Sequence, residues 1–179
     1  AFPVPDMMSG RTSSEWKLEV YADNFINSKY GISEEYTANA FFRLTATLFT
    51  DRVNLVIWGP MVEYFRIGNR ICEERRIDSK VPLRKTISGD IYVSTDFMIL
   101  TQERHNVDVS LRTALKSASG NDYSNARYYD NAGYFFDAAI GRKFVLNPGR
   151  SDLSIAASGG FLCWQTDNGR QNDAVMYGL

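Results

Sequence analysis

The sequence YTANAFFRLTATL, at residues 36–48, alternates with a period of two along its whole length. Its even positions are all apolar and uncharged, whereas its odd positions are mostly polar and include Arg43. Successive side chains of a β-strand point to opposite faces, so the pattern predicts one long strand with an apolar and a polar face. Strands of soluble domains usually have about 5–6 residues, whereas a tilted strand that crosses a bilayer needs about 9–11. The length and the uncharged face therefore predict a strand of a membrane β-barrel.

Seven further segments alternate in a similar way. They cover residues 15–26, 52–67, 89–101, 106–116, 134–145, 152–165 and 173–179. Within 52–67, Gly59 and Pro60 interrupt the alternation, which predicts a bulge and a shift of phase.

The connections between these segments alternate between short and long. The turns at 50–51, 102–105 and 146–151 are short, whereas 27–35, 69–88, 117–133 and 166–172 are longer and polar. Outer-membrane barrels have short periplasmic turns on one rim and longer extracellular loops on the other. The sequence therefore predicts an all-β fold, an up-and-down antiparallel transmembrane β-barrel of at least eight strands, with a periplasmic N-terminus.

Composition limits the function classes. A length of 179 residues fits one domain, which we divide into a flexible lead-in at 1–14 and a barrel at 15–179. The net charge of −1 argues against a nucleic-acid partner, and no apolar run is long enough for a transmembrane helix.

Cys72 and Cys163 are not expected to form a disulfide. No His/Cys spacing is typical of a metal site, so we expect neither a metal nor a cofactor.

The two ends of the sequence carry their own expectations. The chain begins AFPVP, without a basic and apolar leader, so we expect an exported protein whose signal peptide has been removed. The last segment, 173–179, is shorter than the roughly 9–11 residues that a bilayer requires. We therefore expect the chain to stop inside a strand, either of a larger barrel or of an incomplete eighth strand.

Aromatic residues lie near the ends of the predicted strands. They are Trp16, Tyr36, Trp58, Tyr64, Tyr134, Phe135, Trp164 and Tyr177. Membrane barrels carry girdles of aromatic side chains at both interfaces. The set predicts such girdles, although aromatic side chains are also common in any β-core.

Four stretches resemble outer-membrane β-barrel proteins of the Bacteroidetes type. They are GDIYVST at 89–95, LRTALKSASG at 111–120, ARYYDNAGYFFD at 126–137 and GFLCWQT at 160–166. The resemblance covers roughly residues 89 to 179, and the first half agrees only in style. It implies a porin-like barrel of roughly twelve strands, within the range of such barrels, and no catalytic residues.

The polar faces form the candidate functional surface, because they would line the lumen of a membrane barrel. Charged rings in a lumen set solute preference, whereas eight strands enclose a core that side chains fill. The lumen is therefore expected to filter small solutes or to be filled, and the outer face to contact outer-membrane lipid. The predicted lumen-facing charges are Lys17, Glu19, Arg43, Asp90, Asp96, Asp108, Arg112, Lys116 and Asp137.

The long loop at 117–133 contains a second candidate pair, Arg127 and Asp130. These residues are expected to pair with each other and order an extracellular loop, and the alternative is a site for a sugar or an ion. The face assignment also predicts that Val109→Asp, on the face toward lipid, destabilises the barrel, whereas Ser110→Asp on the lumen face is tolerated.

Two other function classes remain open. A soluble lipocalin-like barrel would invert the faces, so that the apolar side lines a ligand pocket. An outer-membrane lipid-modifying enzyme would need His105, the single histidine, beside a serine and an orienting partner, or else paired lumen carboxylates. Because no such constellation surrounds His105 in the sequence, we expect a protein that is not an enzyme.

Overall fold

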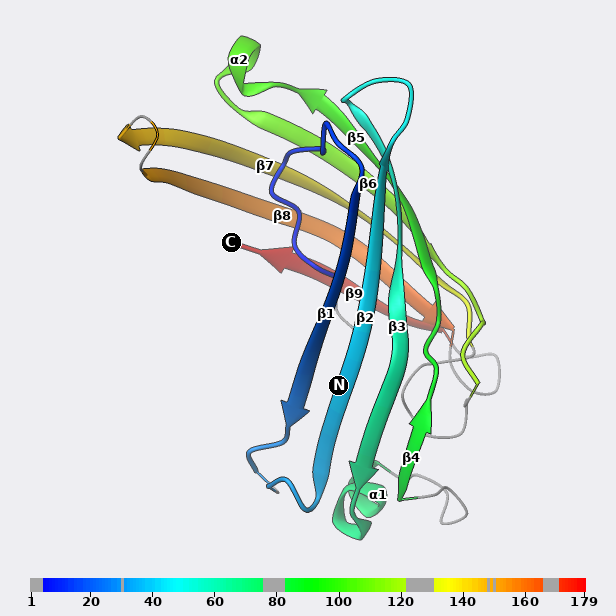
Figure 1. Cartoon of the computed structure of the whole chain (residues 1–179). Helices are drawn as coiled ribbons and strands as arrows, with labels where there is room; N and C mark the ends of the chain where they lie inside the picture. Colours follow the sequence, from blue (N-terminus) through cyan, green and yellow to red (C-terminus); the bar gives the residue numbers. More distant parts are fainter. Residues whose placement is uncertain are drawn as a thin grey trace.

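The structure, a computed structural model, describes residues 5–29, 31–75, 83–121, 131–147, 149, 151–165 and 171–179. The chain forms one antiparallel sheet that curls into a half-barrel (Figure 1). The strands are β1 (Lys17–Ile26), β2 (Glu35–Thr47), β3 (Val53–Ile67), β4 (Arg84–Ile87), β5 (Tyr92–Leu100), β6 (Asp108–Lys116), β7 (Gly133–Asn147), β8 (Ser151–Gln165) and β9 (Gln171–Gly178). The two short helices are α1 (Asn69–Arg75) and α2 (Gln102–His105).

The strands follow an up-and-down order. The sheet runs β1-β2-β3-β5-β6-β7-β8-β9, and β4 pairs with the far end of β3. This confirms the all-β, antiparallel part of the prediction. Within the described residues β1 and β9 are the two edges and are not paired with each other, so the sheet is open.

The bulge predicted in the third strand is confirmed. Ala40 of β2 pairs with Val62, but its neighbour Phe41 pairs with Pro60, so Met61 is the extra residue. The buried positions of β3 change parity at this point, from 54, 56 and 58 to 63, 65 and 67. A Cβ on Gly59 would contact the carbonyl oxygen of Asp90, so the kink packs against the turn before β5.

The connections lie at two rims, and the two longest of them, 68–91 and 117–132, belong to the same rim. The turns after β2, β5 and β7 lie at the rim that carries α2, whereas α1 and β4 lie at the opposite rim (Figure 1). The strand ends between β1 and β2, between β6 and β7 and between β8 and β9 also lie at this second rim. The elements α1 and β4 were not predicted, because they occupy a charged segment without clear periodicity.

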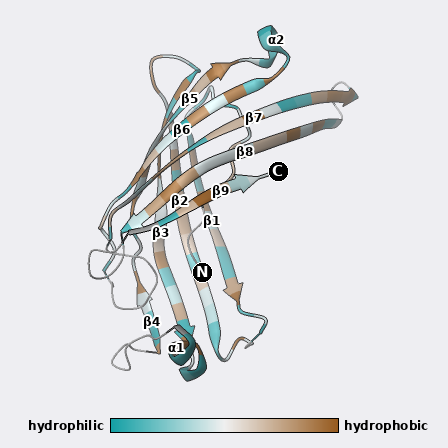
Figure 2. Ribbon diagram, turned by 180° about the vertical axis from the view of Figure 1, so that it is seen from behind, coloured by the Kyte–Doolittle hydropathy of each residue, from teal (hydrophilic) through white to brown (hydrophobic). Residues whose placement is uncertain are grey.

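The two faces of the curled sheet have opposite chemistry. Among the described residues, 30 large apolar residues are exposed, whereas 13 polar or charged residues are buried. The exposed apolar residues recur at alternate positions, as in Leu111 and Leu115 of β6 or Phe136 and Ile140 of β7. Figure 2 shows hydrophobic and hydrophilic residues following one another along the strands. The buried charged residues face the hollow of the half-barrel, and the exposed apolar residues of β5 to β8 face outward.

An aromatic cluster lies on the hollow side. Trp58, Tyr92, Phe135 and Trp164 are all buried, and Trp58 stacks on Tyr92 with 5.2 Å between ring centroids. Phe135 and Trp164 meet edge to face at 6.2 Å. The prediction of interface girdles is therefore wrong for Trp58, Phe135 and Trp164, because all three have the parity of the polar face.

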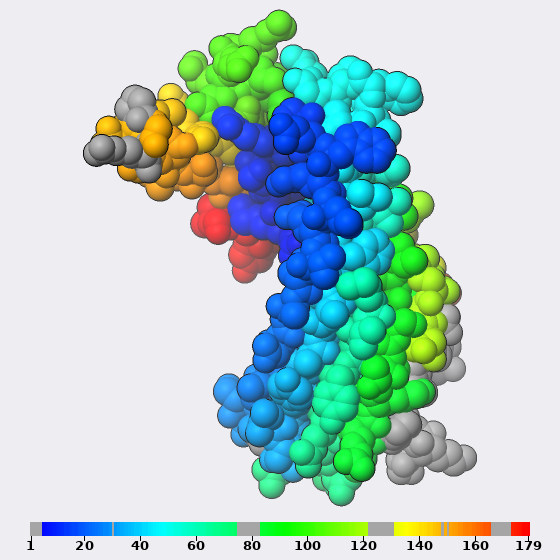
Figure 3. Space-filling view, in the orientation of Figure 1, coloured from blue at the N-terminus to red at the C-terminus, as the bar shows by residue number. Residues whose placement is uncertain are grey.

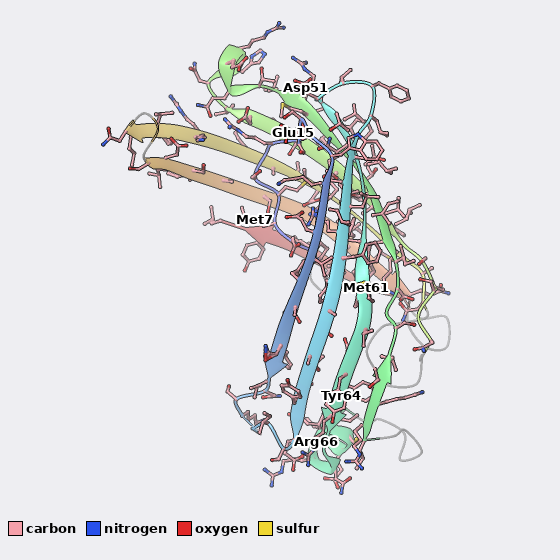
Figure 4. All side chains as sticks on the ribbon, in the orientation of Figure 1. Met7, Glu15, Asp51, Met61, Tyr64 and Arg66 are labelled. Atoms are coloured by element: carbon pink, nitrogen blue, oxygen red, sulfur yellow. The ribbon has the colours of Figure 1, made fainter. Side chains whose placement is uncertain are left out.

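Residues 5–16, which we call the N-terminal strap, lie in the hollow of the sheet. Figure 3 shows this dark-blue segment between the two edge strands, and Figure 4 shows Met7 beside β9. A Cβ on Gly178 of β9 would lie 2.8 Å from Met7 Sδ. The segment predicted as a flexible lead-in thus packs along the hollow face, as far as residues 5–14 are described.

Candidate functional site

Strand β6 places three buried charges on the hollow side of the sheet. Asp108, Arg112 and Lys116 are four residues apart and are 4%, 2% and 2% exposed. Alternate residues of a strand share a face, so this spacing aligns all three. Each of them meets a group of opposite charge from another segment. This matters because a buried charge is costly unless it is paired and hydrogen-bonded.

The central pair joins β6 to β7. Arg112 and Asp137 are cross-strand partners. Arg112 Nε donates to Asp137 Oδ1 at 2.8 Å, and its Nη2 donates to Oδ2 at 2.7 Å. This bidentate geometry is the strongest form of an arginine–carboxylate contact. The guanidinium also lies over the ring of Phe135, 5.0 Å from its centroid.

The second pair closes the rim of the long connections. Lys116 and Asp90 form an ion pair whose side chains are both 0% exposed. Lys116 Nζ also donates to the backbone oxygen of Asn131 at 2.5 Å and to its Oδ1 at 2.8 Å. Asp90 Oδ1 accepts from the backbone N–H groups of Ser119 at 2.9 Å and Gly120 at 2.6 Å. This pair therefore fastens the start of the loop after β6 to the turn before β5.

The third pair lies at the opposite rim and uses the N-terminal strap. Arg11 forms an ion pair with Asp108, whose other oxygen accepts from the backbone N–H of Gln102 at 2.6 Å. The side chain of Gln102 in turn donates from Nε2 to the backbone oxygen of Lys143 and accepts at Oε1 from its backbone N–H, each at 2.7 Å. Arg11 was not predicted as a site residue, because it lies 97 positions from Asp108 in a segment without periodicity.

The N-terminal strap makes further hydrogen bonds along the hollow. The side chain of Asn54 in β3 accepts from the backbone N–H of Ser13 at 2.6 Å and donates to its oxygen at 2.9 Å. Asp6 contacts Arg43 of β2 through its carboxylate, and its backbone oxygen accepts from Arg112 at 2.8 Å. The strap therefore joins segments of the sheet that lie on opposite sides of the hollow.

The other predicted lumen charges are more exposed. Asp96 is half-buried, accepts from Ser94 Oγ at 2.9 Å and lies opposite Arg112 in the register. Lys17 and Glu19 share the face of their register partners Thr45 and Arg43, yet they are exposed. All ten residues of β1 are exposed, because this strand is an edge of the open sheet. Arg127 and Asp130 lie outside the described residues.

Groups that could support catalysis or metal binding are dispersed. His105 is exposed in α2, and no hydrogen bond joins its imidazole to another described side chain. In the described ranges, no three His, Cys, Asp or Glu side chains are grouped to hold a metal ion. Cys72 and Cys163 form no disulfide. The geometry of this face is that of paired charges and packed aromatic rings.

No protein-family model matches the chain, and no curated protein or solved structure is significantly similar to it. None of the described helices is long and apolar enough to cross a membrane. The class that the structure defines is an all-β, up-and-down antiparallel sheet with a hollow that is lined by buried charges and aromatic rings.

Proposed function

We propose that this chain forms the wall of a bacterial outer-membrane β-barrel, porin-like or structural, with a charged lumen. The Bacteroidetes-type resemblance of residues 89–179 agrees with this assignment. The observation that carries the proposal is the inverted polarity of the sheet, with apolar residues outside and charges inside.

This inversion suits a bilayer and not water. Soluble monomers rarely expose apolar patches larger than a few hundred Å². Here each of the strands β5 to β8 presents large apolar side chains outward, with Phe97, Leu111, Phe136 and Ile155 between 39% and 57% exposed. Hydrocarbon tails would cover this surface at no cost. Strands β2, β3, β7 and β8, with 13 or 15 residues, exceed the roughly 9–11 that a tilted crossing requires.

A bilayer also requires that the sheet edges be paired. Unpaired backbone groups are not tolerated against lipid, so membrane sheets close into barrels. Both edge strands, β1 and β9, would therefore be paired in the membrane. Because β1 and β9 are the first and the eighth strand of the main path, they run antiparallel, and either direct pairing or an even number of added strands preserves the up-and-down order.

The hollow supports a filled or filtering lumen. The three charges of β6 are neutralised by Arg11, Asp90 and Asp137, and the N-terminal strap occupies part of the space. A lumen of this kind resembles a side-chain-filled core more than a wide aqueous channel. Solute passage would then depend on the strap and on the total number of strands.

The soluble lipocalin-like alternative needs the opposite arrangement of faces, with an apolar pocket inside. The enzyme alternative needs partners for His105 that the described residues do not supply. Neither alternative has a specific contact in its favour, so the barrel remains the better proposal.

Migration on SDS gels tests the proposal. A folded membrane barrel resists SDS until it is heated, so we expect a faster band without boiling, a requirement for detergent and spontaneous insertion into lipid vesicles. A chain that remains monomeric in buffer without detergent, and that gives one band with and without boiling, would favour the lipocalin-like alternative.

A further inference from the structure

In one contact between the N-terminal strap and the sheet, a carboxylate of the strap binds an arginine of the wall as a carboxylate ligand would. Arg43 Nη1 donates to Asp6 Oδ2 at 3.0 Å, and the two side chains are 23% and 67% exposed. The cross-strand neighbour of Arg43 is Glu19, but no ion pair joins these two within the described residues. The guanidinium thus pairs with a carboxylate from the segment in the hollow and not with its neighbour in the sheet.

Arg43 is held by an aromatic platform. Its Cζ lies 5.7 Å from the ring centroid of Trp58, which stacks on Tyr92. An aromatic face below a guanidinium orients it and leaves its planar fork of N–H donors for a carboxylate. Because Trp58 is 9% exposed and packed in the aromatic cluster, the platform is a fixed part of the wall.

Asp6 is anchored independently of its carboxylate. Its backbone oxygen accepts from Arg112 Nη2 at 2.8 Å, and Arg112 is itself neutralised by Asp137. Ser13 binds Asn54 further along the strap. Removing the Asp6 carboxylate would therefore free the Arg43 donors while the strap stays in place.

We propose that Arg43, seated on Trp58, is a binding site for small carboxylate solutes, and that Asp6 occupies it as an internal competitor. The inference depends on the proposed function in one respect, since it places the site on the lumen wall. A partly exposed ion pair is weak and is screened by salt, so the carboxylate of a solute can compete with the Asp6 carboxylate for Arg43. Glu19, beside Arg43 in the register, disfavours ligands with two or more negative charges.

The test measures acetate binding to the full chain in detergent. Tryptophan fluorescence, to which Trp58 contributes, is followed while sodium acetate replaces sodium chloride at constant ionic strength. Acetamide is the uncharged control. We expect Asp6→Ala to bind acetate about two- to fivefold more tightly than the wild type, which corresponds to the loss of one exposed competing ion pair.

A matched variant removes the same charge elsewhere on the strap. Glu15→Ala also deletes one exposed carboxylate, but the hydrogen bonds of Glu15 are made by its backbone, with Ser13 Oγ. This variant should bind acetate as weakly as the wild type. Arg43→Gln in the Asp6→Ala background should abolish saturable binding, and Arg43→Lys should weaken it because lysine lacks the planar fork.

Three results would overturn the site: equal acetate affinity in wild type, Asp6→Ala and Glu15→Ala; an acetamide response equal to that of acetate; or binding that survives Arg43→Gln. If Arg43→Gln fails to fold by circular dichroism, Arg43→Lys and Glu15→Ala decide the question. Vesicle insertion of the same preparations tests the barrel separately. Insertion without tighter binding by Asp6→Ala refutes the site alone, and acetate binding without insertion refutes the barrel alone.

Discussion

Gly10 of the N-terminal strap and Gly141 of β7 lie against each other in the hollow of the sheet, although they are 131 positions apart in the sequence. A Cβ on Gly10 would lie 2.9 Å from the backbone nitrogen of Gly141, and a Cβ on Gly141 would collide with the backbone oxygen of Ser9. Gly10 also has a φ of +85°, which side chains other than glycine rarely adopt. Two glycines thus let the strap backbone lie directly against the backbone of the wall.

Gly141→Ala should displace the strap and destabilise the protein by about 1–3 kcal/mol, because the added methyl group has no space. The matched control is Gly159→Ala in β8, where the nearest atom to the new Cβ is 3.9 Å away. The control should change stability by about 0.5 kcal/mol or less. Urea unfolding in detergent micelles measures the stability, and limited proteolysis within residues 5–16 reports the strap. Equal behaviour of the two variants would show that the strap does not need this contact.

Asp137→Ala should cost about 3–5 kcal/mol, because it leaves Arg112 buried without its carboxylate. The comparison is Asp152→Ala, which breaks a pair with Lys143 in which both side chains are 38% exposed, and which should cost about 0–1 kcal/mol. Replacing both partners, as Arg112→Met with Asp137→Leu, should recover much of the loss. The urea midpoint checks all three variants, and similar midpoints for Asp137→Ala and Asp152→Ala would contradict the buried pairing.

Asp90→Ala should release the start of the loop after β6. The variant removes the acceptor of two backbone N–H groups, those of Ser119 and Gly120, so their hydrogen exchange should accelerate about tenfold or more. Asp51→Ala, at an exposed turn on the opposite rim, is the control and should leave exchange at residues 117–121 unchanged. Unchanged exchange in Asp90→Ala would mean that this carboxylate does not order the loop.

Much of the sheet could be predicted from the period-two pattern. Alternation located eight of the nine strands that the described residues form, each within a few residues, and the pair Gly59-Pro60 located the bulge. The pairing of Arg112 with Asp137 follows once the register is known. The inward position of Trp58 and Trp164 could also have been predicted from parity, because both share the phase of the polar positions in their strands. The aromatic content near strand ends obscured that signal.

The remaining features depend on contacts that no local pattern encodes. The strap has no periodicity, and its hydrogen-bond partners in the strands lie 34 to 106 positions away. The structure argues against the prediction that Ser110→Asp is tolerated, since Ser110 is 0% exposed and lies opposite Ala139. Parity predicts the face of a residue, but the space on that face depends on what crosses it.

The central claim, that lipid contacts the outward apolar face, is tested most directly by a pair of lysine variants. Leu111 of β6 and Leu83 beside β4 are 44% and 43% exposed. If both side chains faced water, their replacement by lysine should therefore change the free energy of folding by similar amounts. Leu111 lies within a strand of the proposed membrane wall, and Leu83 lies at its rim. In folding titrations with lipid vesicles we predict that Leu111→Lys costs about 2–4 kcal/mol and Leu83→Lys about 0–1 kcal/mol. Equal and small effects of the two substitutions would contradict the account.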